Sequence, residues 1–390
     1  MLTRLDRRTL LAGSLALGAS GFALPRIALA QASGTRNLLF VLLRGAADGM
    51  AMLAPVGDPG LGALRGASLA DYDGATRIDN FFALHPALGE LGKAAQAGEA
   101  LFVHAAATAY RERSHFDGQN LIETGGMAPY AARDGWLNRL VGLIGEVHQG
   151  ALPRALAVAS TVPLALRGAA PVSSYAPSAL PNASADFMAR VGALYEGDAE
   201  LSGLWARALE TRAMASDDSL RNLRDASANG ALVASLMRGQ RGARVAMIEV
   251  DGWDTHANQR GAFARAARGL DALLAAYRTG MGDAWGETMV LVATEFGRTA
   301  RLNGTNGTDH GTASAALVFG GDVRGGRVVA DWPGLNPAQL YEGRDLAPTI
   351  ALEGVLAGAV AEHFRLDPAQ TLTRLFPGRS TKSLAGIIRA

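Results

Sequence analysis

Four short segments of this 390-residue chain carry most of the side chains that could do acid–base or metal chemistry. They are LLRGAADG (42–49), DGWDTHANQ (251–259), TEFGR (294–298) and TDHGT (308–312). The first three follow runs of leucine and β-branched residues, which predict buried strands. Open α/β sheets place reactive groups at the carboxyl ends of parallel strands, and carboxylates with imidazoles bind divalent metals. The segments therefore indicate a metal-assisted hydrolase.

Seven side chains in these segments are candidate metal ligands. They are Asp48, Asp251, Asp254, His256, Glu295, Asp309 and His310. Asp48 and Asp251 each precede a glycine, and an Asp-Gly pair also forms a turn without any further role. Asp254 and His256 are two residues apart in one loop, so both can turn toward one ion. The loop around Asp309 is rich in glycine, which lets the backbone approach a ligand closely.

Glu295 leaves a very apolar predicted strand, and burial of an unpaired carboxylate is costly. Its carboxylate must therefore be exposed, paired or bound to a metal. Arg298 follows three residues later and is a candidate salt-bridge partner of Glu295. The same arginine could instead neutralise an anionic substrate, so two interpretations of Arg298 stay open.

Ser114 opens a predicted helix in the segment YRERSHFDGQ (110–119), which follows the second predicted strand. Serine is a favoured helix N-cap and needs no further role there. The free N–H groups and the positive dipole end of a helix also suit an anion or a serine alkoxide. Arg111 and Arg113 add anion-binding charge. Ser114 is therefore a candidate nucleophile, provided that a metal lies within reach.

The first 30 residues have the pattern of an export signal. Arg7 and Arg8 precede a weakly apolar stretch, and Ala28-Leu29-Ala30 offers a cleavage site. An arginine pair in this position is typical of the twin-arginine pathway. The twin-arginine translocase is the expected partner during export, and the expected location is periplasmic or secreted. No later apolar run reaches about 20 residues, so no stable membrane insertion is expected after signal removal.

Composition excludes several classes of protein and site. The formal charge is +1, and the signal segment accounts for about +3 of it, which leaves the mature chain near −2. This balance gives no reason to expect a nucleic-acid partner. The chain has no cysteine, which excludes disulfides, thiolate nucleophiles, cysteine-ligated zinc and a formylglycine made from cysteine.

Strand and helix patterns alternate along the mature chain. Strands are predicted over 37–43, 100–105, 154–159, 244–250, 288–294 and 315–319, and helices over 84–97, about 114–124, 136–148, 262–277 and 352–364. Such alternation favours a doubly wound α/β layer. Residues 171–181 are rich in proline and serine and are predicted to be a loop. Residues 186–238 show helical periodicity without a strand candidate, which indicates a helical insertion or lid.

Six motifs together resemble the exported bacterial family of domain of unknown function 1501, a remote branch of the alkaline phosphatase and sulfatase superfamily. They are LLRGAADG, RSHFDGQ, GWLNR (135–139), DGWDTH, TEFGRT and GTDHGT. The resemblance covers essentially the whole mature chain, 31–390. It implies an alkaline-phosphatase-like three-layer α/β/α sandwich with a mostly parallel central sheet, a helical insertion at about 182–240, and a site at the carboxyl edge of the strands.

The superfamily pattern can be placed on this chain in order. Asp48 stands for the aspartate after the first strand, Ser114 for the nucleophile and His310 for the final histidine in a glycine-rich loop. Asp254 and His256 are similar to the Asp/His pair of the superfamily, at a shorter spacing, and Asp251 could replace Asp254. A consecutive Asp-His should follow the next strand, but here Glu295 is followed by phenylalanine. The resemblance thus implies a single-metal or rearranged site.

The expected function is an exported, metal-dependent hydrolase of phosphate or sulfate esters, acting on a small molecule or a polysaccharide. The divalent ion is Zn, Mn, Ca or Mg, with Arg111, Arg113 or Arg298 neutralising the anion and Asp309 supporting His310. One alternative is a catalytically silent binding or assembly protein of the cell envelope. Another is a transferase that passes a phosphoryl or sulfuryl group to a surface polymer, with 186–238 as the acceptor platform.

Overall fold

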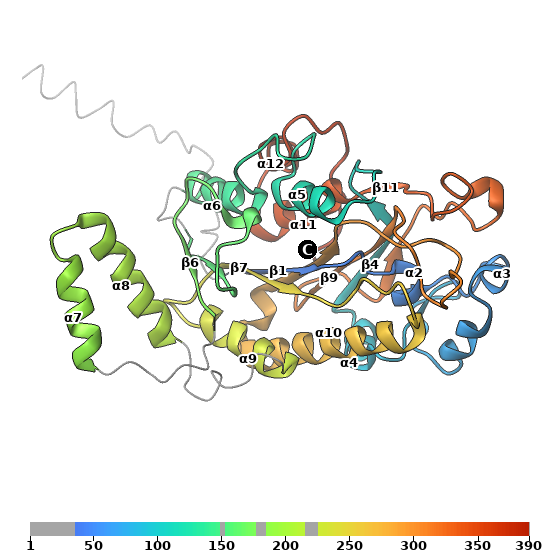
Figure 1. Ribbon diagram of the computed structural model, residues 1–390, viewed down its shortest axis with the longest axis horizontal. Helices are drawn as coiled ribbons and strands as arrows, with labels where there is room; N and C mark the ends of the chain where they lie inside the picture. Colours follow the sequence, from blue (N-terminus) through green and yellow to red (C-terminus); the bar gives the residue numbers. More distant parts are fainter. Residues whose placement is uncertain (1–35, 149–152, 177–184, 215–224, 390) are drawn as a thin grey trace, which may run out of the picture. The chain divides into compact units, whose positions relative to one another are not determined.

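The computed structural model of the chain describes residues 36–148, 153–176, 185–214 and 225–389 (Figure 1). The segment Gly34–Ala390 forms one compact unit. The predicted export signal at 1–30, including Arg7, Arg8 and the cleavage site, lies outside the described residues. No helix in the described part of the chain combines the length and the apolar character needed to cross a bilayer.

A sheet of nine strands forms the centre of the described unit. Its strands are β1 (Asn37–Leu43), β4 (Ala100–Ala107), β5 (Ala155–Ala157), β6 (Val172–Ser174), β7 (Val245–Val250), β8 (Thr288–Thr294), β9 (Ser314–Gly320), β10 (Arg327–Val329) and β11 (Ile350–Ala351). They are ordered β10-β4-β9-β8-β1-β7-β5-β6, and β11 also pairs with β4. Most neighbours pair in parallel, which confirms the predicted mostly parallel sheet.

Strand β9 is the exception, because it runs antiparallel to both β4 and β8. Its reversal has a direct consequence for the four polar segments. The end of β1, the end of β7, the end of β8 and the start of β9 all reach the same edge of the sheet. Segment 308–312 therefore meets the other three segments although it precedes its strand.

Helices cover both faces of the sheet (Figure 1). One layer contains α6 (Trp136–Val147), α11 (Leu352–Phe364) and α12 (Pro368–Leu375), and the other contains α4 (Gly89–Gln96), α9 (Ala226–Met237) and α10 (Gln259–Met281). Along β1, Leu38 and Phe40 belong to the first core, whereas Leu39 and Val41 belong to the second. Alternate side chains of a strand point to opposite faces, so β1 is buried on both. This is the predicted α/β/α sandwich.

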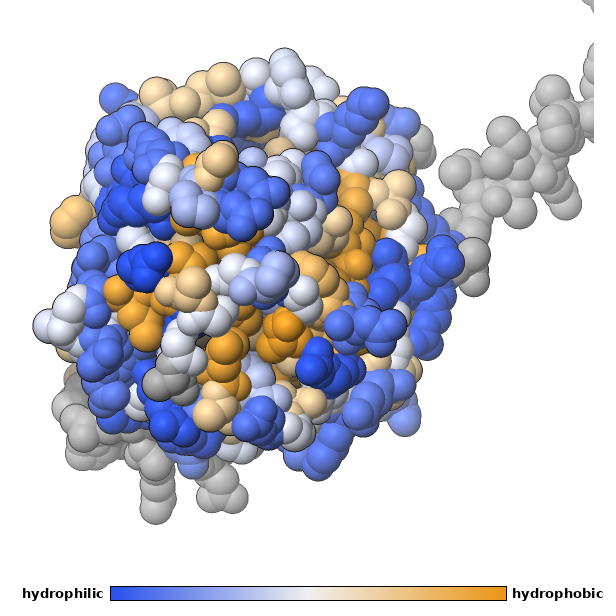
Figure 2. Space-filling model, turned by 90° about the vertical axis from the view of Figure 1, so that its right-hand side faces the viewer, coloured by the Kyte–Doolittle hydropathy of each residue, from blue (hydrophilic) through white to orange (hydrophobic). Residues whose placement is uncertain are grey.

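The remaining described elements are short, apart from α5 and the pair α7 and α8. They are α2 (Gly49–Met52), β2 (Leu53–Ala54), α3 (Leu61–Arg65), η1 (Gly66–Tyr72), β3 (Ala83–Leu84), α5 (His115–Thr124), η2 (Leu164–Leu166), α7 (Ala185–Tyr195), α8 (Ala199–Met214), η4 (Gly282–Glu287) and η5 (Pro337–Gln339). Beyond the sheet, Leu61, Leu335 and Leu346 belong to a separate smaller core. Apolar side chains also gather on the surface at the end of the molecule that carries α3 (Figure 2).

The observed elements differ from the predicted ones at three places. The helix predicted over 84–97 begins only at Gly89, because Ala83–Leu84 forms β3 and pairs with β2. Strand β6 lies within the predicted loop 171–181, of which 177–181 is outside the described residues. The predicted insertion at about 182–240 includes α9, yet α9 packs against α10 in the sandwich. Its residues 182–184 and 215–224 are also outside the described part.

Two fully buried histidines make folding stability depend on pH. Burial lowers the pKa of His104 to about 4 and that of His363 to about 3. His104 Nε2 lies 2.9 Å from the Leu53 carbonyl oxygen, and His363 Nε2 lies 3.0 Å from that of Asn37. The unfolded chain takes up protons near pH 6.5, while the folded chain keeps both rings neutral. Their contribution to stability is therefore complete above pH 6.5 and is lost as the pH falls toward 4 for His104 and toward 3 for His363.

We expect the free energy of unfolding to fall by about 2 kcal/mol for each of these histidines between about pH 7.5 and pH 5. Urea unfolding at the two pH values measures this loss. His363→Gln keeps an N–H donor without a titrating ring, so the loss should be smaller by about 2 kcal/mol in this variant. An equal pH dependence of the variant and the parent would contradict the assignment.

Candidate metal centre

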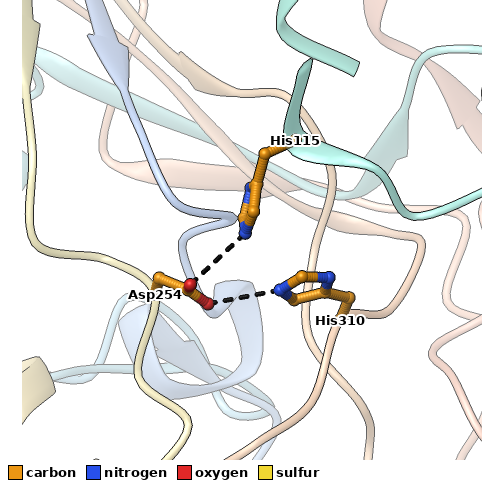
Figure 3. A group of neighbouring side chains, drawn as sticks. All are labelled: His115, Asp254 and His310. Atoms are coloured by element: carbon orange, nitrogen blue, oxygen red, sulfur yellow. Dashed lines mark ion pairs between the residues drawn. The ribbon is translucent and has the colours of Figure 1, made fainter. Parts of the chain in front are cut away.

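Three side chains from distant segments meet at the edge of the sheet where β1, β7 and β8 end. His115 is the first residue of α5, Asp254 follows β7, and His310 precedes β9. One ligand atom from each residue lies within 4.8 Å of the other two. Asp254 stands between the rings: its Oδ2 is 3.5 Å from His115 Nε2, and its Oδ1 is 3.3 Å from His310 Nε2 (Figure 3). His and Asp are a metal-ligand combination.

His256 adjoins this group. Its Nε2 lies 3.0 Å from Asp254 Oδ1 and 3.0 Å from His310 Nε2. The His256 side chain is 46% exposed, whereas the His115 side chain is 22% exposed. Asp254, His256 and His310, three of the predicted ligands, are thus brought together, and His256 forms the solvent side of the group.

Each of the three imidazoles has its Nδ1 next to an oxygen of the protein. The pairs are His115 with Glu295 Oε1 at 2.9 Å, His256 with Asp309 Oδ1 at 3.3 Å, and His310 with the Arg113 carbonyl at 2.9 Å. A carbonyl or carboxylate oxygen only accepts, so each neutral ring donates from Nδ1 and has its lone pair on Nε2. All three Nε2 atoms face the Asp254 carboxylate.

This arrangement collects acceptors around one point. His115 Nε2 is buried and has no hydrogen-bond partner in the described part of the chain. Its 3.5 Å separation from Asp254 Oδ2 is an ion-pair distance but too long for a strong hydrogen bond. Lone pairs that face one another without a donor repel, unless a proton or a cation lies between them. The donor set therefore fits a divalent cation, and the oxygen partner at each Nδ1 is the usual support of a metal-bound histidine.

Glu295 contacts this group only through the Nδ1 atom of His115, on the side of that ring away from Asp254. Its buried side chain accepts from Gly45 N at 2.9 Å, Gln119 Nε2 at 3.1 Å and Thr294 Oγ1 at 2.8 Å, in addition to His115. Burial alone would raise the pKa of Glu295, but the His115 and backbone hydrogen bonds lower it below its usual range. The Glu295 hydrogen bond raises the pKa of His115 in turn. Glu295, predicted as a ligand, instead accepts from His115 Nδ1 and holds that ring in place.

Arg298 fixes the position of Asp254. Its buried guanidinium donates from Nη1 to Asp254 Oδ1 at 2.6 Å and from Nε to Thr308 Oγ1 at 3.1 Å. Partial burial would raise the pKa of Asp254, but Arg298 and the neighbouring imidazoles lower it. For His310, burial and the nearby His115 lower the pKa. Arg298 is thus paired with Asp254 and not, as one interpretation of the sequence had it, with Glu295.

Two glycines allow the loops to approach closely enough to build this site. A Cβ atom on Gly297 would lie 1.8 Å from the Ala313 carbonyl oxygen, and one on Gly311 would lie 2.4 Å from the Arg298 backbone. With glycine at both positions, segment 297–299 lies backbone to backbone with segment 309–313, and Arg298 forms a bridge with His310. The glycines of TEFGR and TDHGT are therefore structural requirements.

Asp48 is not part of the group. It is the N-cap of α2, accepting from Ala51 N, and it is buried against Arg65, whose Nη1 lies 2.6 Å from Asp48 Oδ2. Gln259 Nε2 donates to the same oxygen at 2.6 Å. A carboxylate that is already neutralised by a buried arginine has a structural role in this position. The sequence could not reveal this, because nothing marks Arg65 as its partner.

The other predicted site residues lie at the rim. Asp251 is exposed and, in the described part of the chain, makes no hydrogen bond or ion pair with the group. Asp309 is half-exposed; it lies 3.3 Å from His256 Nδ1, not next to His310 as predicted, and accepts from Asn303 Nδ2 at 3.0 Å. Arg113 is paired with Asp345 at 2.8 Å and with Glu342 at 2.5 Å. Ser114 is the N-cap residue of α5, but its side chain makes no capping hydrogen bond.

His115 is the residue that sequence reasoning missed. Its signal was its place directly after Ser114 at a helix start, within the motif RSHFDGQ. The superfamily pattern predicts an imidazole next to Glu295, where Phe296 stands instead. In the structure, the Phe296 ring stacks on the His115 ring at 5.0 Å between centroids. Phe296 and Glu295 thus both position an imidazole that comes from another segment.

The placement of Asp48 gives a test that separates folding from metal binding. Asp48→Asn leaves the buried Arg65 charge unpaired, so the free energy of unfolding should fall by about 3–5 kcal/mol. The folded fraction should still bind metal like the parent. Urea unfolding and metal analysis by mass spectrometry measure the two effects, with Asp254→Asn as the comparison. Normal stability together with lost metal would instead make Asp48 a ligand.

Comparison with known proteins places the chain in a family. No curated protein matches it in sequence. Similar solved structures include the PH0037 protein from Pyrococcus horikoshii, which is 12% identical. The match covers 73% of this chain and 85% of that chain, with a TM-score of 0.34. The 2-O GAG sulfatase BT1596 is 10% identical, with 90% of this chain and 76% of that chain covered and a TM-score of 0.40. A protein in the alkaline phosphatase superfamily from Vibrio parahaemolyticus is 12% identical, with 76% of this chain and 62% of that chain covered and a TM-score of 0.32. The model of the "protein of unknown function (DUF1501)" matches residues 55–376, so the chain belongs to that family, as its motifs predict.

Proposed function

We propose that the chain is a metal-dependent hydrolase of phosphate or sulfate esters, in which His115, Asp254 and His310 hold one divalent cation. The observation that carries the proposal is the convergence of the three ligand atoms, one of which, His115 Nε2, is buried without a hydrogen-bond partner in the described chain. Catalytic zinc has three protein ligands of this kind and keeps one position open. The ester class comes from the superfamily resemblance of the motifs.

Exposure of the group supports a catalytic over a structural metal. The Asp254 side chain is 44% exposed and that of His310 is 26% exposed. A structural zinc site is closed by four protein ligands, whereas a catalytic site must admit its substrate. Two imidazoles with one carboxylate suit zinc or manganese better than calcium or magnesium, which prefer oxygen ligands.

Each neighbouring residue has a role in this proposal. A bound cation would polarise the ester oxygens and lower the pKa of the Ser114 hydroxyl or of a water molecule. Ser114 precedes His115 and leaves its hydroxyl uncommitted as a cap, so it is the proposed nucleophile. Asp309 holds His256 at Nδ1, which leaves Nε2 of His256 to accept or return a proton at the solvent side.

Two of the arginines named from the sequence, Arg113 and Arg298, do not supply the charge for an anionic ester. Arg298 is paired with Asp254, and Arg113 is paired with Glu342 and Asp345. Their positive charge is already balanced by carboxylates. Neutralisation of the ester anion therefore falls to the cation, and the two arginines keep the ligands in position: Arg298 through Asp254, and Arg113 through its carbonyl and His310.

Export is part of the same proposal. The arginine pair, the apolar stretch and the Ala-Leu-Ala site support a twin-arginine signal and a periplasmic or secreted location. The proposed ligands come from residues 115, 254 and 310, so the site exists only in the folded chain. A pathway that exports folded proteins would let the metal enter before export. The substrate would be a small molecule or a polysaccharide ester.

Removal of one ligand should remove both metal and turnover. We expect His115→Ala, Asp254→Ala and His310→Ala to bind substoichiometric metal and to lose hydrolysis of nitrophenyl phosphate or sulfate by more than about 100-fold. His148→Ala is the matched control, because His148 contacts the Phe364 carbonyl and no residue of the group. Full turnover in a metal-free ligand variant would refute the proposal. Turnover that requires an added acceptor sugar would indicate a transferase, and metal binding without turnover a silent envelope protein.

Glu295 would influence metal affinity only through His115, so its replacement should weaken metal binding less than the loss of a ligand does. Glu295→Gln removes the carboxylate that holds His115 Nδ1, so metal affinity should fall by about 10–100-fold while the fold survives. Competition with a chelating dye measures the affinity. Glu249→Gln, which changes a carboxylate bound to Arg44 outside the group, should leave the affinity unchanged. Equal affinities of the two variants would show that His115 needs no such support.

A further inference from the structure

A polar cavity lies near the proposed metal centre. Its volume is about 440 Å³, and it lies where the end of β4 meets β11 and the loop after α12. Its polar lining residues are Thr108, Arg111, Thr349, Glu353, Arg379, Ser380 and Thr381. None of these residues belongs to the group around Asp254.

The cavity wall carries one positive charge that no carboxylate neutralises. Arg111 donates from Nη1 to the carbonyl oxygens of Thr108 and Tyr110, and the structure shows no ion pair for it in the described chain. The nearest carboxylate in the wall, Glu353, is buried and lies 3.2 Å from Arg379 Nε. Glu353 and Arg379 thus balance each other, and the charge of Arg111 remains.

Hydroxyl groups and a helix end surround this charge. The side chains of Thr349, Ser380 and Thr381 make no hydrogen bond within the described chain, so their hydroxyls are free to donate. Helix α11 begins at this wall with Ala351 as its N-cap, which offers no capping side chain. A guanidinium, hydroxyl donors and the positive end of a helix are together the groups that bind a carboxylate, sulfate or phosphate.

The cavity is close to the proposed metal centre. The guanidinium carbons of Arg111 and Arg113 lie 6.0 and 5.9 Å from the centroid of the Tyr341 ring. The Arg113 carbonyl accepts from His310 Nδ1 at 2.9 Å. Both guanidinium groups thus lie against one ring, and the backbone of Arg113 contacts His310, which puts Arg111 near enough to the proposed metal centre for one extended substrate to span the two.

We propose that this cavity binds a second anionic group of the substrate, with Arg111 as its main contact. The substrate would then be an ester that carries a further carboxylate, sulfate or phosphate, as acidic polysaccharides do. That the bound group belongs to a substrate rests on the proposed hydrolase function. The anion site itself can be tested without any metal.

Inorganic sulfate is the probe for the anion site. We expect the full chain, stripped of metal with a chelator, to bind sulfate in a calorimetric titration. Arg111→Gln should weaken this binding by about tenfold or more, since it removes a charge-assisted contact, and Arg111→Lys should weaken it less. Arg238→Gln is the matched control, because Arg238 also donates to a carbonyl but lies at the end of α9 in the opposite layer. Melting curves confirm that each variant is folded. Equal sulfate affinity of Arg111→Gln and the parent would overturn the proposal.

Two esters test the link to catalysis. Arg111→Gln should raise the KM for a nitrophenyl phosphate that carries a ring carboxylate about tenfold more than it raises the KM for nitrophenyl phosphate itself, while kcat for the carboxylate-bearing ester is retained. Equal KM changes for both esters would overturn the second-group assignment. If the parent hydrolyses neither ester, the proposed function fails, and the sulfate titration still decides the anion site.

Discussion

The ion pair between buried Arg298 and half-exposed Asp254 is the interaction on which the rest of the site depends. Arg298 also donates to Thr308 Oγ1, which donates to Gln259, and Gln259 donates to Asp48 in its pair with Arg65. This chain of polar contacts joins the loops after β1, β7 and β8 to the loop before β9. Buried charges of this kind are stable only when each has its partner, so the network fixes the mutual position of these loops.

Such a network explains how acceptors can be crowded around Asp254. Arg298 lowers the pKa of Asp254 and keeps it anionic, while the oxygens of Glu295, Asp309 and Arg113 turn the three rings so that Nε2 faces inward. Each acceptor is thus oriented before any cation arrives. The surrounding hydrogen bonds offset the repulsion among the acceptors in the folded state. A bound cation would relieve this repulsion. Preorganisation of this kind is what a catalytic metal requires.

Much of the sandwich follows from local patterns. The apolar runs of β1 and β8 and the helix α11 have the predicted bounds, because continuous apolar segments between polar ends leave few alternatives. The reversal of β9 was not predictable, since strand direction depends on pairing partners far along the chain. The same limit applies to the site. Asp254, His256 and His310 could be predicted as site residues from their residue types. The ion pair of Asp48 with Arg65 could not, because it depends on tertiary contacts.

The sequence pattern predicts an imidazole directly after Glu295, and the structure instead brings the His115 ring to this place from another segment. Glu295 accepts from His115 Nδ1 and Phe296 stacks on the His115 ring, so both residues at the end of β8 position a histidine that α5 supplies. Asp48, which the pattern offers to a metal, is neutralised by Arg65. The described acceptors around Asp254 therefore suffice for one cation, and the carboxylate that a second cation would need already has a buried partner. Under the proposed function, a single-metal centre follows from this charge balance.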